Sequence, residues 1–113
     1  MKESELLKSA TDYLQILENQ GKLIFQRNNS FAGMVLHKNK TTGYIKNSKR
    51  GASDLIVFLP KGKYLCAEAK SIKGIQSEDQ KLFEEKITKL GGNYAIFRNF
   101  EELKTIIDIY LTN

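Results

Sequence analysis

Cysteine, histidine and long apolar stretches are scarce in this sequence, and each scarcity excludes a class of protein. The 113 residues include one cysteine, Cys66, so no internal disulfide can form, and we expect a reducing, cytoplasmic environment. The longest apolar run, Leu55 to Leu59, is far shorter than the roughly 20 residues that a membrane-spanning helix needs, so no membrane association is expected. With one histidine, His37, and no Cys/His cluster, a zinc site is not expected either.

Two further kinds of active site find no support in the sequence. There is no glycine-rich phosphate-binding loop, and Cys66 lies in an apolar strand pattern that favours a packing role over a nucleophilic one. What remains is an ordinary soluble composition, with 41% hydrophobic and 27% charged residues. The length suits one domain with one core, over residues 1–113.

Acidic residues are missing from one long stretch. No Asp or Glu occurs between Glu18 and Asp54, while cations, amides and aromatic residues alternate there, and the net charge of the chain is +5. Such a stretch suits a polyanion, because each phosphate contact releases condensed counterions. The alternative is a solvated basic face. We predict nucleic-acid contacts from Arg27, Asn28, Lys38, Lys40, Lys46, Lys49 and Arg50.

Apolar periodicity predicts an α/β protein in which helices cover a mixed sheet. Helices are expected over Glu3–Asn19, from Ser77 to Gly91-Gly92, and over Phe100–Leu111. Strands are expected over Lys22–Arg27, Asp54–Leu59, Lys63–Ala69 and Asn93–Arg98, with a further pair at Met34–His37 and Gly43–Lys46. The second helix is expected to bury Leu82, Phe83, Ile87 and Leu90, and the last strand to be buried and parallel to its neighbour.

Three polar residues stand at the ends of two apolar strands. Pro60-Lys61-Gly62 predicts a tight turn, and counting back equally from it places Asp54 opposite Glu68 or Ala69. Glu68 and Lys70 are two residues apart, so their side chains share one face of the strand. Two converging carboxylates are ligands that Mg²⁺ prefers, and a neighbouring lysine can orient or deprotonate water. The alternative is a surface ion pair between Glu68 and Lys70.

The combination of motifs resembles the PD-(D/E)xK nuclease superfamily, and within it the stand-alone VRR-NUC domain of phages and bacteria. The resemblance rests on Glu3-Ser4-Glu5-Leu6-Leu7, Arg27-Asn28, Gly51-Ala52-Ser53-Asp54-Leu55-Ile56, Ala67-Glu68-Ala69-Lys70 and the segment from Ser77-Glu78-Asp79-Gln80 to Gly91-Gly92. Ser53 stands where the family has proline before the aspartate. The resemblance implies a restriction-endonuclease-like α/β/α core with a mixed central sheet.

The resemblance also implies roles for individual residues. Asp54 and Glu68 would bind Mg²⁺ or Mn²⁺ with the Ala69 carbonyl, and Lys70 would position the attacking water. Gln80 would point from its helix toward the lysine, although a capping-box role is an alternative. Glu3 would join the metal shell from the first helix, with Glu5 as the rival for that position.

By resemblance, the function is that of a metal-dependent DNA endonuclease. Stand-alone members of this size resemble structure-specific enzymes, including Holliday-junction resolvases that act as homodimers on branched DNA, in the cytoplasm of a bacterium or of a phage-infected cell. The first and last helices are candidate dimer surfaces. Two alternatives remain, a non-catalytic nucleic-acid-binding module on the same fold and a site-specific or general nickase.

Overall fold

The structure is a computed structural model that describes residues 1–28, 32–36, 42–46 and 50–112, with the backbone alone described in the two middle ranges. The elements, in chain order, are α1 (Glu3–Asn19), β1 (Ile24–Arg27), β2 (Ala32–Leu36), β3 (Thr42–Lys46), β4 (Leu55–Phe58), a 3-10 turn η1 (Pro60–Gly62), β5 (Tyr64–Ala69), α2 (Glu78–Lys89), β6 (Asn93–Phe97) and α3 (Phe100–Thr112). The order and the α/β class agree with the sequence prediction.

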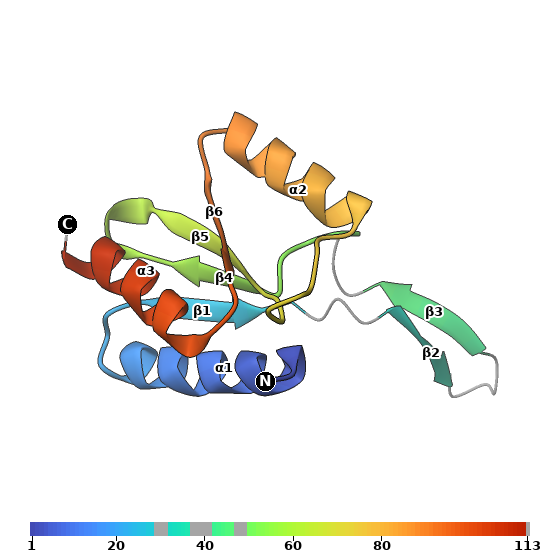
Figure 1. The fold of residues 1–113 in the computed structure, drawn as a ribbon, viewed down its shortest axis with the longest axis horizontal. Helices are drawn as coiled ribbons and strands as arrows, with labels where there is room; N and C mark the ends of the chain where they lie inside the picture. Colours follow the sequence, from blue (N-terminus) through green and yellow to red (C-terminus); the bar gives the residue numbers. More distant parts are fainter. Residues whose placement is uncertain (29–31, 37–41, 47–49, 113) are drawn as a thin grey trace.

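Four strands form a mixed sheet in the order β1-β4-β5-β6 (Figure 1). The pairs β1–β4 and β4–β5 are antiparallel, and β5–β6 is parallel, as the strand-helix-strand pattern predicted. The strands β2 and β3 pair antiparallel with each other in a separate two-stranded sheet. Both strands of the pair expected at Met34–His37 and Gly43–Lys46 therefore exist, although His37 lies outside the described residues.

Helix α1 buries one apolar stripe against the sheet and ends in a glycine cap. Gly21 has a φ of +75°, and the Lys22 N–H bonds to the Leu17 carbonyl at 3.0 Å, which closes the last turn of the helix. This cap uses the backbone of Lys22, which explains why β1 begins at Ile24 rather than at the predicted Lys22.

Helices α1 and α3 cover one face of the sheet, and the hydrophobic core lies between these layers (Figure 1). Its fully buried large side chains include Leu6, Leu14, Leu55, Val57, Leu65, Phe97, Leu103 and Ile107. Cys66 is also buried, as its strand pattern predicted. Within the described ranges, no helix has the length and hydropathy to cross a membrane.

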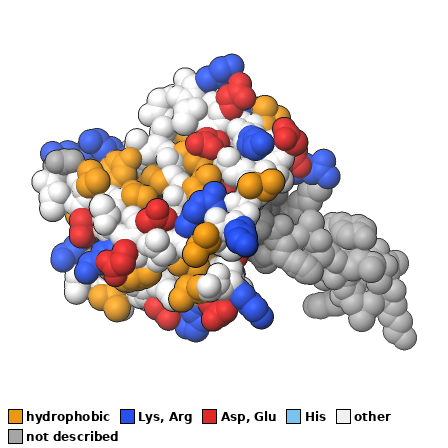
Figure 2. All heavy atoms as spheres, viewed as in Figure 1, with side chains coloured by type: hydrophobic (Ala, Val, Ile, Leu, Met, Phe, Trp, Pro, Cys, Tyr) orange, Lys and Arg blue, Asp and Glu red, His pale blue; other side chains and the backbone are white. Residues whose placement is uncertain are grey.

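Helix α2 lies on the opposite face of the sheet against the edge strand β6, and its predicted burial is wrong (Figure 1). Leu82 and Leu90 are exposed, and Phe83 and Ile87 are only half-buried. In β6, likewise, Phe97 alone is buried. The physical reason is that α2 covers only an edge strand, so its far side meets solvent. Figure 2 shows hydrophobic side chains reaching the surface among charged ones on the viewed face.

Candidate active site

The β4–β5 hairpin brings the predicted acids together. Leu55 pairs with Ala67, so the next positions outward are Asp54 and Glu68, as counting from the turn predicted. The Ala69 N–H donates to Asp54 Oδ2 at 2.9 Å, which fixes one carboxylate oxygen of Asp54 against β5. Asp54 itself lies just before β4, so its side chain stands at the sheet edge rather than within the ladder.

Two neighbours hold the backbone that carries Asp54. The Asn28 N–H donates to the Asp54 carbonyl at 2.8 Å, and the Asn28 side-chain amide donates to the Ser53 carbonyl at 2.9 Å. Ser53 is fully buried, and its hydroxyl donates to the Leu55 carbonyl at 2.9 Å. The segment before β4 is therefore anchored by hydrogen bonds on both sides of Asp54.

Glu68 is an acidic residue in the interior of the fold. Its side chain is 0% exposed, and neither carboxylate oxygen has a hydrogen-bond partner among the described residues. Burial raises the pKa of Glu68 to about 7, an effect that Lys70 opposes and the negative charge of Asp54 reinforces. A buried carboxylate without partners is costly, so this position calls for a proton or a cation.

Lys70 follows β5 directly and is 7% exposed. Its backbone N–H donates to the Phe97 carbonyl at 3.0 Å, which ties the end of β5 to the end of β6. No carboxylate of the described residues lies within ion-pair distance of its ammonium group. A surface ion pair between Glu68 and Lys70 does not describe this arrangement, because both side chains are buried and they form no ion pair.

Burial also raises the pKa of Asp54, although less strongly. The Ala69 N–H and the positive charges of Lys70 and Arg27 act in the opposite direction, and the negative charge of Glu3 adds to the effect of burial. Asp54, Glu68 and Lys70 therefore interact electrostatically with one another. The described structure brings these three predicted residues into one site.

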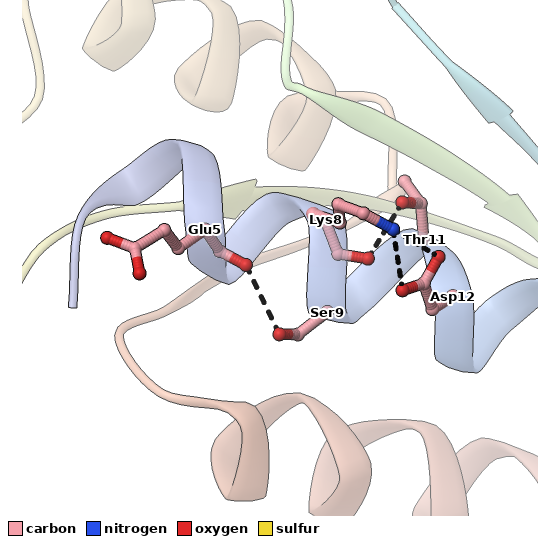
Figure 3. A network of polar contacts seen from close by, with 5 residues as sticks. All are labelled: Glu5, Lys8, Ser9, Thr11 and Asp12. Atoms are coloured by element: carbon pink, nitrogen blue, oxygen red, sulfur yellow. Dashed lines mark hydrogen bonds and ion pairs between the residues drawn. The ribbon is translucent and has the colours of Figure 1, made fainter.

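Between the two acids of the first turn of α1, Glu3 is the one that faces the site. Glu3 Oε2 accepts a hydrogen bond from the Ser71 N–H at 3.4 Å, beside Lys70, and its charge affects the pKa values of Asp54 and Glu68. Glu5 Oε1 instead accepts from the Lys2 N–H at 3.4 Å. Figure 3 shows Glu5 on a polar face of α1 whose contacts run along the helix itself.

Gln80 forms the capping box that its position predicted. Gln80 Oε1 accepts from the Ser77 N–H at 2.9 Å, and Ser77 Oγ accepts from the Gln80 N–H at 3.2 Å. The oxygen of the amide is therefore engaged at the start of α2, whereas its NH₂ group has no hydrogen bond to any described residue. The catalytic role of Gln80 stays a prediction.

The donor set fits a hard divalent cation of the Mg²⁺ type. Among residues 1–28 and 50–112 no group of three Asp, Glu, His or Cys side chains lies at ligand spacing, so Glu3 does not complete a three-carboxylate cluster. Mg²⁺ binds through one or two carboxylates and keeps water or phosphate oxygens as its other ligands. Asp54 and the unpartnered Glu68 supply two carboxylates of the kind that such a cation binds.

The comparisons with known proteins agree with this architecture. No family model matches the sequence, and no curated protein matches it. A solved structure described as a VRR_NUC domain superposes with a TM-score of 0.67 at 22% sequence identity, over 97% of this chain and 98% of that one. The chain has the fold of a VRR_NUC domain. The resemblance inferred from the sequence is thus confirmed for the fold.

On this VRR_NUC fold, three of the predicted DNA-binding residues have described side chains. Arg27 is exposed at the end of β1 and is close enough to affect the pKa of Asp54. The side chain of Asn28 is committed to Ser53, and Arg50 Nε forms an exposed ion pair with Asp79 Oδ2 at 3.3 Å. Lys38, Lys40 and Lys49 lie outside the described residues, and of Lys46 only the backbone, at the end of β3, is described.

Two residues near the site escaped the sequence analysis, and both come from the β6 segment of the VRR_NUC fold. The hydroxyl of Tyr94 lies near Glu68, and it accepts from Gln76 Nε2 at 3.4 Å. Arg98 donates to three carbonyls of the loop that follows Lys70. In the sequence, Tyr94 resembles a core aromatic and Arg98 a strand-end cation, so neither carried a signal.

Proposed function

We propose that the protein is a divalent-metal-dependent nuclease that hydrolyses phosphodiester bonds in DNA. The observation that carries the proposal is the buried Glu68 carboxylate without a hydrogen-bond partner, beside Asp54 and Lys70 at one edge of the sheet. The similarity in fold to a VRR_NUC domain and the net charge of +5 support it. A carboxylate pair with a buried lysine suits phosphate hydrolysis. The carboxylates balance the positive charge of the metal, and the lysine balances the negative charge of the phosphate.

Asp54, Glu68 and the Ala69 carbonyl would hold Mg²⁺ or Mn²⁺ in this proposal. When bound, the cation supplies charge stabilisation to the phosphate and lowers the pKa of a coordinated water. The Ala69 N–H holds Asp54 Oδ2, so Asp54 Oδ1 would be the oxygen available as a ligand. Burial excludes water from the Glu68 side, which strengthens every electrostatic interaction there.

Lys70 would orient the attacking water and offset negative charge on the phosphate. Strand alternation puts it on the same face as Glu68, and its low exposure restricts the ammonium group to the site. Water would attack phosphorus opposite the leaving oxygen, and the fixed cationic groups would stabilise the charge that develops.

The test is cleavage of DNA by the full chain with and without Mg²⁺ or Mn²⁺. We expect metal-dependent cleavage that Asp54→Asn, Glu68→Gln or Lys70→Met each lowers by at least about 100-fold, because each removes a group that acts on the reacting phosphate. Lys63→Ala, an exposed change next to η1 at the far end of the β4–β5 hairpin, is the control and should cleave at the wild-type rate. Full activity in both Asp54→Asn and Lys70→Met would exclude this site as the origin of cleavage.

We further propose branched DNA as the substrate and a homodimer as the active form, because cleaving two opposed DNA strands requires two active sites. Helix α3 supports a dimer surface, since it leaves Ile109 exposed and Tyr110 half-buried. The comparison is a four-way junction against its own linear arms at equal concentration, with the mass measured by light scattering. Equal cleavage of both substrates would indicate a general nickase, and salt-sensitive binding without cleavage in any metal a binding module.

A further inference from the structure

The loop that follows Lys70 has no apolar anchor of its own. Residues 71–76 connect the site to α2, and the two isoleucines of this loop, Ile72 and Ile75, are 78% and 82% exposed. A loop without buried side chains keeps one conformation only if polar contacts hold its backbone. Any freedom in this loop is transmitted directly to Lys70, because Ser71 is the next residue in the chain.

Arg98 supplies those polar contacts. One nitrogen of its guanidinium group, Nη1, donates to the Ser71 carbonyl at 2.6 Å and to the Gly74 carbonyl at 2.7 Å, with the Ile72 carbonyl at 3.3 Å. The two short bonds use both hydrogens of Nη1, so the contact to Ile72 is a weaker, shared one. Hydrogen bonds from a charged donor are about twice as strong as neutral ones, so Arg98 can hold the backbone of the loop 71–74 without help from buried side chains of that loop.

The position of Arg98 is itself fixed next to the end of β5. The preceding residue, Phe97, accepts the backbone hydrogen bond of Lys70 at 3.0 Å. The Arg98 N–H donates to Glu102 Oε1 at 2.6 Å, and the Glu102 N–H donates to Asn99 Oδ1 at 2.9 Å, so the start of α3 holds the Arg98 backbone. The backbone of Arg98 is therefore held both by the sheet and by helix α3.

The same loop also positions Glu3. The Ser71 N–H donates to Glu3 Oε2 at 3.4 Å, and a Cβ added to Gly74 would lie 3.1 Å from that oxygen. The glycine thus leaves space for the carboxylate directly over the loop. Moving the loop would displace Lys70 on one side and Glu3 on the other.

We infer that Arg98 is a positioning residue, which orders the loop 71–74 and thereby sets the placement of Lys70 and Glu3 in the site. This inference rests on the proposed nuclease function. Arg98 acts through the loop carbonyls and not on the DNA, so its loss slows the chemical step while DNA binding is retained. Lysine is a poor replacement, because its ammonium nitrogen lies one bond nearer the backbone than Nη1 and is carried by a flexible stem rather than by a planar group.

The test compares Arg98→Lys and Arg98→Ala with the control Lys63→Ala. First, hydrogen exchange at the Ser71 and Gly74 amides is measured in the metal-free protein, with thermal unfolding to confirm that each variant is folded. We expect faster exchange at both amides in both Arg98 variants and no change in the control. Unchanged exchange in the folded Arg98→Lys variant would overturn the inference, whether or not the protein cleaves DNA.

Second, single-turnover cleavage and DNA binding are measured in the same variants. We expect the cleavage rate to fall by roughly 10- to 100-fold at unchanged DNA affinity, since small misplacements of a reacting group cost rates of this order. Added guanidinium should partly restore the rate of Arg98→Ala and not that of Lys70→Met. Wild-type rates in the Arg98 variants would overturn the inference, whereas absence of cleavage by the wild type would contradict the proposed function itself.

Discussion

At the scale of single residues, burial sets the chemistry of Glu68. A carboxylate with no hydrogen-bond partner and no solvent holds its proton more tightly than one in water, so its pKa rises to about 7. The free-energy cost of burying this carboxylate falls next to Lys70 and Asp54. No hydrogen bond from a described residue offsets that cost. Such a cost at a sheet edge is typical of functional sites.

This pKa predicts how the stability of the metal-free protein depends on pH. The ordinary pKa of 4.5 applies when the chain is unfolded, so the folded state binds more protons between pH 4.5 and about 7. The contribution of Glu68 to stability is fully present below pH 4.5 and is lost as the pH rises through about 7. We expect Glu68→Gln to become more stable relative to wild type between pH 5 and pH 8, by up to about 3 kcal/mol.

Denaturant unfolding at the two pH values, without metal, measures this difference. The control is Glu101→Gln, which removes an exposed carboxylate on α3 and should not change the pH dependence. A stability difference between Glu68→Gln and wild type that stays constant with pH would contradict the assignment of a raised pKa to Glu68.

Gly51 lies against the start of α2, where a side chain would not fit. Its φ is +77°, and a Cβ there would overlap the carbonyl oxygen of Asp79 at the start of α2. Gly21 has a similar φ of +75° with no atom near a Cβ. Gly51→Ala should therefore destabilise the fold by more than the roughly 1 kcal/mol that a left-handed alanine costs, while Gly21→Ala shows that cost alone.

The measurement is the free energy of unfolding of the two alanine variants by denaturant, with wild type as the reference. The difference between the variants isolates the contact of Gly51 with α2 from the shared backbone strain. Equal losses in the two variants would show that the loop before Asp54 can move away from α2 at no cost.

At the scale of elements, the start of α2 combines a cap with a candidate site residue. Ser77 and Gln80 satisfy each other's backbone N–H groups, so the helix begins at a fixed place beside the loop that follows Lys70. Because Oε1 of Gln80 is used in the cap, the NH₂ group is the part of this side chain that remains for the site.

The substitution Gln80→Glu separates the capping role of Gln80 from its predicted role in the site. A capping box accepts glutamate in place of glutamine, so Gln80→Glu should keep the stability of the fold within about 0.5 kcal/mol. The cleavage rate should fall, because glutamate has no NH₂ group to donate to the site. Thermal unfolding and single-turnover cleavage are the two measurements.

Ser77→Ala is the matched change for the cap. It should lower stability by about 1 kcal/mol while retaining the Gln80 amide and the cleavage rate below the unfolding transition. If Gln80→Glu cleaves as fast as wild type, the role of Gln80 is confined to the cap.

At the scale of the whole molecule, net charge and its placement would govern the proposed encounter with DNA. The chain carries a charge of +5, and the exposed Arg27 lies beside Asp54 at the edge where the site is located. A cation next to two carboxylates allows a phosphate to approach a site that would otherwise repel it.

Binding of DNA should therefore weaken as salt rises, and Arg27 should contribute to the slope. In a plot of log affinity against log salt concentration, Arg27→Ala should reduce the magnitude of the slope by about 0.9, the value for one phosphate contact. Fluorescence anisotropy without divalent metal gives the slopes. Lys8→Ala, which removes a cation paired with Asp12 on α1, should leave the slope unchanged; an unchanged slope in Arg27→Ala would remove Arg27 from the interface.

Much of this protein follows from local sequence alone. The bounds of α1 follow from its apolar period and Gly21, and the meeting of Asp54 with Glu68 follows from a short turn between two apolar strands. The Ser77–Gln80 cap was likewise predicted, because all its contacts lie within four residues. These features were predictable since neighbours in the sequence determine them.

Other features depend on contacts between distant segments, and only the tertiary structure decided them. Leu82 and Leu90 have the spacing of a buried face, yet they are exposed because α2 packs on an edge strand. Nothing in the sequence distinguishes Arg98 or Tyr94 from ordinary strand residues until the parallel β5–β6 pair brings them beside the site. The sequence alone indicated which groups are candidates to act on a phosphate. The assembled sheet decided how deeply Glu68 is buried and which side chain holds the loop after Lys70, because burial and long-range hydrogen bonds exist only in the packed chain.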